Sequence, residues 1–464
     1  MKPVLLIDFG STYTKVTAVD VQAEEILGTA RAFTTIQSDI NEGLDHAVAL
    51  LEMKIGKVDY VNRFACSSAA GGLKMVTVGL VPDLTAEAAK RAALSAGAKV
   101  SGVYSYELSE QEVREIEEIR PDIILLTGGT DGGNKNVILH NAGMIAGIAG
   151  DFPVVVAGNK SVASEVERLL KSAGKDVRAC RNVMPEFNRL NIEPAREAIR
   201  DVFLQRIVRA KGLTKVENLV EGILMPTPSA VLKAIHILSI GHGDEKGLGD
   251  LMAVDVGGAT TDVYSISAGN PTRGGVILKG LPEPFAKRTV EGDLGVRYSA
   301  AFLAEAVGVE KVAGTAGLAV EEVQNCLEKI KENPEILPEQ DEKIGLLDFG
   351  LASMAVKAAV SRHVGTIEMA YTPMGAAYVQ TGKDLTGVRR VIGTGGPVIN
   401  NPRAGEVMQQ VLFDETQPAE LRPAKAEIMI DKKYILAAMG LLSEKYPETA
   451  VRIMKKELEM ISWN

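Results

Sequence analysis

The apolar residues of the chain include a strand pattern that runs into a glycine-rich turn and then returns. In the stretch 251–267, LMAVDVGGATTDVYSIS, Val254–Val256 predicts the buried end of a β-strand and Thr261–Ile266 predicts a returning strand. The turn between them, Gly257–Ala259, has two adjacent glycines, which let the backbone turn and present N–H groups to a ligand. Such amides suit phosphate oxygens, and Asp255 before the turn could hold Mg²⁺. A single turn of this kind would also fit an ordinary hairpin.

A second copy of this pattern lies near the start of the chain, as VLLIDFGSTYTKV. At a constant offset the copies align Asp8 with Asp255, Gly10 with Gly257, Thr12 with Ala259 and Lys15 with Asp262. Two strand–turn–strand units with an acid at the same place predict an internally duplicated α/β fold with one phosphate hairpin in each half. Two such hairpins facing each other could hold one polyphosphate from both sides.

A third apolar run, at 391–402, also leads into a glycine-rich turn, VIGTGGPVINNP. In order and spacing, the three elements resemble the two phosphate motifs and the adenosine motif of the actin, sugar-kinase and heat-shock-ATPase superfamily. The resemblance implies a duplicated actin-like (ribonuclease H-like) ATPase fold, in which the nucleotide lies in a cleft between two halves. It also implies ATP and Mg²⁺ as cofactors.

Between the two phosphate motifs, strands alternate with helices of about 10 to 15 residues, which is typical of a parallel α/β sheet. We therefore expect a flavodoxin-like domain inserted at 98–210, an N-terminal actin-like half at 1–97 and 211–250, and a C-terminal half at 251–464. The loop Gly128–Gly133 follows a strand end, where open α/β sheets bind ligands. This loop could bind an anion, touch a partner or be a plain crossover turn.

The superfamily resemblance assigns roles to residues of the two hairpins. The residues expected at the phosphates are Gly10, Ser11, Thr12, Lys15, Gly257, Gly258, Ala259 and Thr260. Asp8 and Asp255 are expected at the metal and in catalysis, and Asp8 could instead orient the attacking water. Lys15 could equally lie on the surface, and Asp262 is expected to be structural.

Further residues are expected near the rest of the nucleotide. Gly292 and Asp293 would lie beside it, with Asp293 capping the following helix and leaving that helix's first amides free. Gly393, Gly395 and Gly396 would form a flat backbone shelf for adenine, where a Cβ atom would collide with the ring.

Composition narrows the classes of function. The 464 residues carry a net charge of −9, which argues against nucleic acid or an anionic membrane as the main partner. The five His and three Cys are dispersed, which argues against a disulfide framework or a structural zinc site. No apolar run approaches the roughly 18 residues of a membrane span. We expect a reduced, cytoplasmic protein, and a homo-oligomer is compatible with the sequence.

A longer set of motifs resembles one family within this superfamily. The segments IDFGSTYTK, ACSSAAGGLKM, LLTGGTDGGN, DVGGATTDVYS, TVEGDLG and GTGGPVINNP look like the MutL/GlmL family, encoded beside cobalamin-dependent glutamate mutase. The resemblance implies an ATP-dependent chaperone or reactivation factor whose client is glutamate mutase or a related cobalamin-dependent mutase. It implies an ATPase that is slow when alone.

Three other classes of protein share parts of this pattern. Activators of 2-hydroxyacyl-CoA dehydratases carry a cysteine after the second phosphate motif, but the corresponding RTVEGDLGVR here has none, so we expect no iron–sulfur cluster. A small-metabolite kinase is the main alternative, with the loop GHGDEKGLGD as the candidate acceptor site. A scaffold that binds ATP without hydrolysing it is the third.

Overall fold

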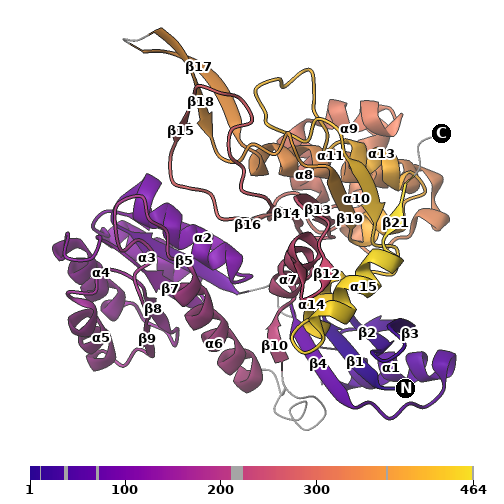
Figure 1. The fold of residues 1–464 in the computed structure, drawn as a ribbon, viewed down its shortest axis with the longest axis horizontal. Helices are drawn as coiled ribbons and strands as arrows, with labels where there is room; N and C mark the ends of the chain where they lie inside the picture. The colour runs from indigo at the N-terminus through magenta and orange to yellow at the C-terminus, as the bar shows by residue number, and fades with distance from the viewer. Residues whose placement is uncertain (11, 36–39, 69–72, 211–222, 373–374, 462–464) are drawn as a thin grey trace. The chain divides into compact units, whose positions relative to one another are not determined.

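The computed structural model describes residues 1–10, 12–35, 40–68, 73–210, 223–372 and 375–461, and it divides into two compact units (Figure 1). The first unit comprises Met1–Lys233, Gly280–Pro282 and Ala437–Thr449. The second unit comprises Ala234–Lys279, Glu283–Leu436 and Ala450–Asn464. Each unit contains a mixed sheet, and two neighbouring strands of that sheet form one of the predicted hairpins.

The mixed sheet of the first unit has the strand order β10-β4-β1-β2-β3. Its strands are β1 (Pro3–Phe9), β2 (Tyr13–Asp20), β3 (Glu25–Phe33), β4 (Asn62–Ser67) and β10 (Ile223–Pro226). β1, β2 and β3 pair in antiparallel order, whereas β4 is parallel to both β1 and β10. Helix α1 (Ile40–Ile55) packs on β2 and β3 through an apolar stripe, in which Leu44 and Leu51 are buried.

The mixed sheet of the second unit repeats this topology. Its strands are β13 (Leu251–Val256), β14 (Thr261–Ile266), β16 (Ala286–Glu291), β19 (Arg390–Thr394), β20 (Glu427–Ile430) and β21 (Glu459–Met460), in the order β16-β14-β13-β19-β20-β21. β13, β14 and β16 are antiparallel, and β19 is parallel to both β13 and β20. The order β16-β14-β13-β19-β20 therefore matches β3-β2-β1-β4-β10 strand for strand, which confirms the predicted duplication.

The first unit also holds a five-stranded parallel sheet with the order β6-β5-β7-β8-β9. Its strands are β5 (Lys74–Gly79), β6 (Lys99–Ser105), β7 (Ile123–Leu126), β8 (Val154–Val156) and β9 (Val177–Ala179). The connecting helices are α2 (Glu87–Ser95), α3 (Glu110–Ile119), α4 (Asn136–Gly147) and α5 (Ala163–Ser172), and α6 (Glu193–Ala210) follows β9. Numbered along the chain from β5, the order is 2-1-3-4-5, the flavodoxin-like order. The predicted flavodoxin-like sheet is therefore present.

This parallel sheet starts earlier than the range 98–210 expected for the inserted domain. Its strand β5, which lies between β6 and β7, begins at Lys74, upstream of that range. Alternate residues of the sheet lie in two separate cores, for example Met75 in one and Val76 in the other, so both faces are covered. A strand buried on both faces shows no polar alternation. The sequence pattern of β5 therefore did not reveal to which sheet it belongs.

A π-helical turn, Pro82–Ala86, precedes α2, which begins at Glu87. The hydroxyl of Thr85 in this turn accepts hydrogen bonds from the amides of Leu80 and Val81, at 2.7 and 3.0 Å. Thr85 therefore stabilises the loop after β5.

The remaining elements complete the two units. They are α7 (Thr227–Ile240), β11 (Gly241–His242), β12 (Glu245–Lys246), β15 (Val276–Lys279), α8 (Ala300–Val307), α9 (Val309–Ala316), α10 (Val320–Glu332), a 3₁₀ turn (Pro338–Gln340), α11 (Glu342–His363), β17 (Thr366–Thr372), β18 (Gly375–Thr381), α12 (Gly396–Ile399), α13 (Ala404–Gln409), α14 (Leu436–Leu442) and α15 (Pro447–Glu457). Among the described residues, only α11 has the length and hydropathy of a membrane span, and 72% of its most apolar window is buried in the fold. It is the central core helix of the second unit.

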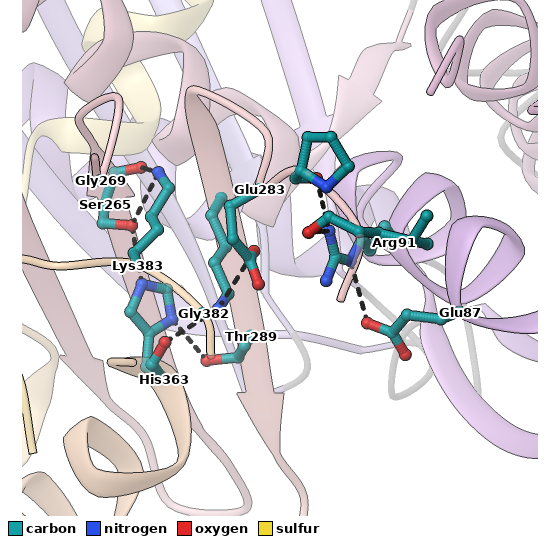
Figure 2. A network of polar contacts seen from close by, with 12 residues as sticks. Glu87, Arg91, Ser265, Gly269, Glu283, Thr289, His363, Gly382 and Lys383 are labelled. Atoms are coloured by element: carbon teal, nitrogen blue, oxygen red, sulfur yellow. Dashed lines mark hydrogen bonds and ion pairs between the residues drawn. The ribbon is translucent and has the colours of Figure 1, made fainter. Parts of the chain in front are cut away.

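A buried polar network anchors the end of α11 to the second mixed sheet (Figure 2). The ring of His363 bonds the hydroxyls of Thr289 and Ser265, at 2.9 and 2.8 Å. Lys383, also fully buried, donates to the carbonyl of Phe285 at 2.8 Å. Burial and the neighbouring ammonium groups of Lys287 and Lys383 hold the pKa of His363 well below its usual value.

We expect acid to destabilise the protein through His363. The folded state keeps this ring neutral, whereas the unfolded chain protonates it below a pKa of about 6.5. The free energy of unfolding should therefore fall by up to about 1.4 kcal/mol for each pH unit below that value. Urea denaturation at neutral and mildly acidic pH should show a shallower pH dependence in His363→Gln than in the wild type. The matched control His140→Gln alters an exposed ring, and it should keep the wild-type slope. An unchanged slope in His363→Gln would contradict this assignment.

Candidate functional site

The first hairpin joins β1 to β2 in a register that places Asp8 opposite Lys15. Its turn closes with a hydrogen bond from the Gly10 amide to the Tyr13 carbonyl, at 3.0 Å. A Cβ atom on Gly10 would lie 2.5 Å from that carbonyl oxygen, so only glycine fits there. Thr34 fixes the turn from behind, because its hydroxyl donates to the Gly10 carbonyl at 2.9 Å. Ser11, one of the predicted phosphate contacts, lies outside the described residues.

Asp8 lies at the carboxyl end of β1, where it is 7% exposed. One of its carboxylate oxygens accepts a hydrogen bond from the Thr227 hydroxyl at 2.6 Å and a weaker one from the Cys66 thiol at 3.5 Å. The other oxygen lies 3.5 Å from the ammonium group of Lys15. Burial, reinforced by the charge of Asp8, raises the pKa of the Cys66 thiol well above its usual value, which keeps this thiol protonated.

Thr227 is a residue of this site that the sequence did not single out. It opens α7 directly after β10, and β10, β4 and β1 run parallel with their carboxyl ends at one edge of the sheet. This topology carries Thr227 to Asp8 across 219 positions of sequence. The available signal was the segment MPTPSA, in which a threonine between two prolines stands at the start of an apolar helix.

The second hairpin has the geometry of the first. Asp255 lies opposite Asp262, as Asp8 lies opposite Lys15. The Gly257 amide donates to the Thr260 carbonyl at 2.9 Å, the counterpart of the bond from Gly10 to Tyr13. The alignment predicted from the sequence is therefore also the alignment of the two structures.

The carbonyls of the second turn accept hydrogen bonds from the segment that packs against it. The Gly257 carbonyl accepts from the Val296 amide at 3.2 Å. The Gly258 carbonyl accepts from two amides, those of residues 297 and 298, each at 2.9 Å, and the Ala259 carbonyl accepts from the hydroxyl of residue 299 at 2.8 Å. Within the described part of the chain, the amides of Gly258, Ala259 and Thr260 donate to no protein acceptor. Three consecutive N–H groups with unmet hydrogen-bonding capacity form a suitable nest for an anion.

The segment 291–299 is held against this turn by close packing. A Cβ atom on Gly295 would lie 2.3 to 2.5 Å from the backbone of Ala259 and Gly258, so glycine is required there. The Thr261 hydroxyl donates to the carbonyl of Leu294 at 2.6 Å and adds a second link between the two segments.

The prediction that Asp293 caps the following helix is wrong. Helix α8 begins at Ala300, with Ser299 at its N-cap position. The carboxylate of Asp293 instead forms a two-pronged ion pair with Arg362, at 2.7 and 2.8 Å, and this pair lowers the pKa of Asp293. The intervening residues wrap around the phosphate hairpin, which separates Asp293 from the helix. Gly292 stays beside the turn, because its carbonyl accepts from the Ser299 hydroxyl at 3.2 Å.

The third motif is adjacent to the second hairpin, because β19 pairs in parallel with β13. Gly395, with a φ of +90°, packs so closely that a Cβ atom would lie 2.6 Å from a carboxylate oxygen of Asp255. Gly396 is open, since only Asn400, at 3.9 Å, would touch its Cβ atom. Gly393 points into the core, where a Cβ atom would meet Met408 at 2.8 Å. A ligand shelf can therefore use Gly395 and Gly396, whereas Gly393 is glycine for internal packing.

The Gly128–Gly133 loop is secured by buried amide side chains. The amides of Asp131, Gly132 and Gly133 donate to the Pro185 carbonyl, the Asn159 side chain and the Thr130 carbonyl, respectively. Asn182, which is 2% exposed, donates to the Gly129 carbonyl at 3.0 Å and to the Asp131 carboxylate at 3.1 Å. Since these amides are already used, the loop does not form an anion nest from them. Among the described residues, no donation is seen from the amides of residues 128–130, so an anion site, a contact surface and a structural turn all stay predictions for this loop.

The strand order and the paired hairpins define a duplicated actin-like fold that carries a flavodoxin-like sheet. The chain belongs to the MutL family, whose model, described as MutL protein, matches residues 4–458. Protein MutL of Clostridium tetanomorphum is 54% identical over 460 residues, covering 99% of each chain. Among solved structures, component A of the (R)-2-hydroxyglutaryl-CoA dehydratase of Acidaminococcus fermentans matches 97% of this chain and 100% of that one, at 11% identity and a TM-score of 0.32. Gluconate kinase from Lactobacillus acidophilus matches 99% and 93%, at 11% identity and a TM-score of 0.38.

The equivalent positions Lys15 and Asp262 should differ in their importance for stability. Asp262 is bonded by the guanidinium of Arg288, at 2.7 and 2.6 Å, and the Arg288 side chain is only 4% exposed. Asp262→Ala would leave this cation buried without its partner, which should lower the free energy of unfolding by about 3 to 5 kcal/mol. Lys15→Met removes a side chain that is 25% exposed and should cost about 1 kcal/mol or less. Urea unfolding of both variants checks this, and equal losses would contradict the structural role of Asp262.

Proposed function

We propose that this protein binds Mg-ATP, hydrolyses it slowly when alone, and serves as a chaperone or reactivation factor for a cobalamin-dependent mutase. The observation that carries the nucleotide proposal is the turn 257–260, in which the carbonyls are bound and the amides of Gly258, Ala259 and Thr260 donate to no protein acceptor among the described residues. The same hairpin, with an acid at the same register, occurs in both units. Membership in the MutL family supports a mutase, such as glutamate mutase, as the client.

The side chains present are compatible with Mg²⁺ bound together with a nucleotide. Among the described residues no group of three or more His, Cys, Asp or Glu side chains could hold a metal ion by itself. Mg²⁺ usually takes one or two carboxylates and completes its shell with water and substrate phosphates. Asp255 and Asp8 each supply a carboxylate at the start of a phosphate hairpin. The ion would neutralise charge on the phosphate oxygens.

The chain's own residues would position the phosphates and the attacking water. In the second unit, the amides of Gly258, Ala259 and Thr260 would donate to phosphate oxygens. In the first unit, Lys15, opposite Asp8, is a cation suited to phosphate. Asp8, fixed by the Thr227 hydroxyl, would orient the water. Phosphoryl transfer needs mainly positioning and charge neutralisation, so this arrangement suffices without a covalent nucleophile.

Loss of either acid should abolish ATP turnover without unfolding the protein. Asp8→Asn and Asp255→Asn keep side-chain volume and remove only the charge, and each should lower kcat by about 100-fold or more. Phosphate release without an added acceptor is the measurement, and circular dichroism checks the fold. Asp244→Asn, in the exposed loop that was the candidate acceptor site of a kinase, should keep the wild-type rate. Full activity in both hairpin variants would show that the site is misassigned, and turnover only with an added metabolite would indicate a kinase.

We further propose that the flavodoxin-like sheet carries the docking surface for the mutase, at the Gly128–Gly133 loop. The loop is rigid, and a cavity of about 470 Å³ lies beside it, lined in part by Asp131 and Lys160. Phe187 is 70% exposed on the adjoining turn, whose Pro185 carbonyl bonds the loop. An exposed aromatic residue on a rigid support is typical of a protein contact.

Substitutions at the rim of this loop should separate docking from catalysis. Asp131 is unsuitable as a target, because its carboxylate accepts from the Lys160 amide and from Asn182. Phe187→Ser with Lys135→Glu changes only exposed side chains, so basal ATP turnover should persist while co-purification of glutamate mutase is lost. Arg114→Glu on α3 is the control and should retain the mutase. Retained binding in the double variant would disprove this surface, and a fall in basal turnover would assign the loop to the nucleotide.

A further inference from the structure

The first hairpin lies beside a second cation, Arg31 on β3, which the proposed function does not use. Arg31 is directly opposite Lys15 in the pairing of β3 with β2, and Lys15 is opposite Asp8 in the pairing of β2 with β1. Residues directly opposite each other in an antiparallel pair place their side chains on the same face. Asp8, Lys15 and Arg31 therefore form a row across three strands that lie side by side (Figure 1).

This row lies on the face of the sheet that α1 does not cover. Alternate residues of β2 and β3, such as Val16 and Ala30, point to the other face and are buried in one core with Leu51 of α1. The side chain of Lys15 is 25% exposed, and Arg31 is exposed. The two cations are therefore accessible to a ligand from solvent.

The end of β3 lies at the turn of the first hairpin. The Thr34 amide donates to the Thr12 carbonyl in that turn at 2.9 Å. The guanidinium carbon of Arg31 lies 5.1 Å from the centre of the Tyr13 ring, which is a cation–π contact. Phe33 stacks on the same ring, with 4.7 Å between the ring centres. Because the Tyr13 carbonyl closes the turn, its ring holds the guanidinium of Arg31 beside the turn.

The charges of this row are not balanced within the chain. Like charges directly opposite each other on neighbouring strands destabilise a sheet. Asp8 lies 3.5 Å from Lys15 and compensates for one of the two positive charges. In the described part of the chain no acid pairs with Arg31, and its charge contacts the Tyr13 ring instead. An anion bound at this face would offset the remaining repulsion.

The second hairpin shows that the scaffold itself does not require a cation at this position. The position that corresponds to Lys15 is Asp262, and β16 places Val290 opposite Asp262. Val290 is therefore the counterpart of Arg31. The strand order and the turn geometry are the same in both halves, so a structural need of the hairpin does not explain Arg31.

We propose that Arg31 is a second phosphate-binding cation beside Lys15, and that Tyr13 positions its guanidinium. This proposal rests on the proposed binding of Mg-ATP. A guanidinium is always charged, and its planar set of N–H donors matches the oxygens of a phosphate. Lys15 adds a more compact charge on the same face. The first hairpin thus offers an anion two cations, where the second hairpin offers backbone amides.

Isothermal titration with Mg-ATP at several salt concentrations tests the role of Arg31. Arg31→Gln removes the charge of an exposed side chain, and it should raise the Kd of Mg-ATP by about tenfold or more, with an unchanged circular dichroism spectrum. The Kd of this variant should also depend less on ionic strength than that of the wild type, because one charge fewer meets the phosphates. Arg273→Gln is the matched control. It removes another exposed guanidinium, 6.0 Å from the Tyr378 ring, and should keep the wild-type Kd and salt dependence.

A second pair of variants tests the positioning role of the Tyr13 ring. Tyr13→Leu should raise the Kd by about threefold, because the guanidinium loses its support, whereas Tyr13→Phe keeps the ring and should retain the wild-type Kd. Equal losses in these two variants would overturn the positioning role. A wild-type Kd or an unchanged salt dependence in Arg31→Gln would overturn the role of Arg31 and leave the nucleotide proposal intact. A wild type that binds no Mg-ATP would overturn both.

Discussion

The candidate site depends on a backbone constraint, namely that the carbonyls of Gly257, Gly258 and Ala259 are bonded on the side away from the free amides. The amides of 296–298 and the hydroxyl of Ser299 meet this constraint, and Gly295 is the residue that lets them approach. Because each peptide unit directs its N–H opposite to its C=O, binding the carbonyls turns the amides outward. The outward direction of these amides therefore comes from the segment that packs behind the turn.

The two halves share this scaffold but fill it differently. In the first hairpin, Asp8 is in contact with Thr227, Cys66 and Lys15, a set that includes one partly exposed cation. In the second hairpin, the position that corresponds to Lys15 is Asp262, and this acid is committed to the buried Arg288. The duplication therefore preserved the backbone while the charge opposite each acid changed sign. One half keeps a partly exposed cation beside its acid, and the other uses the position for a buried ion pair.

The parallel sheet shows how the same glycine-rich pattern can serve a different purpose. The loop Gly128–Gly133 follows a strand end, as the phosphate hairpins do. The amides of residues 131–133 are nevertheless used by the Asn159 side chain and by neighbouring carbonyls, and Asn182 holds the other side of the loop. Glycines allow a turn to expose amides, but the surrounding side chains decide whether those amides remain available.

The sequence by itself determined the local elements: both hairpins, their common alignment, the alternating strands and helices, and the structural role of Asp262. These follow from residue periodicity and turn chemistry, which act over a few residues. Tertiary structure alone decided that Thr227 contacts Asp8 and that β5 belongs to the parallel sheet. It also decided that Asp293 pairs with Arg362 instead of capping the helix. It also decided that Gly393 faces the core. Each of these contacts joins residues that are far apart in sequence. Strand order and packing bring such residues together, and a local sequence pattern does not encode their contact.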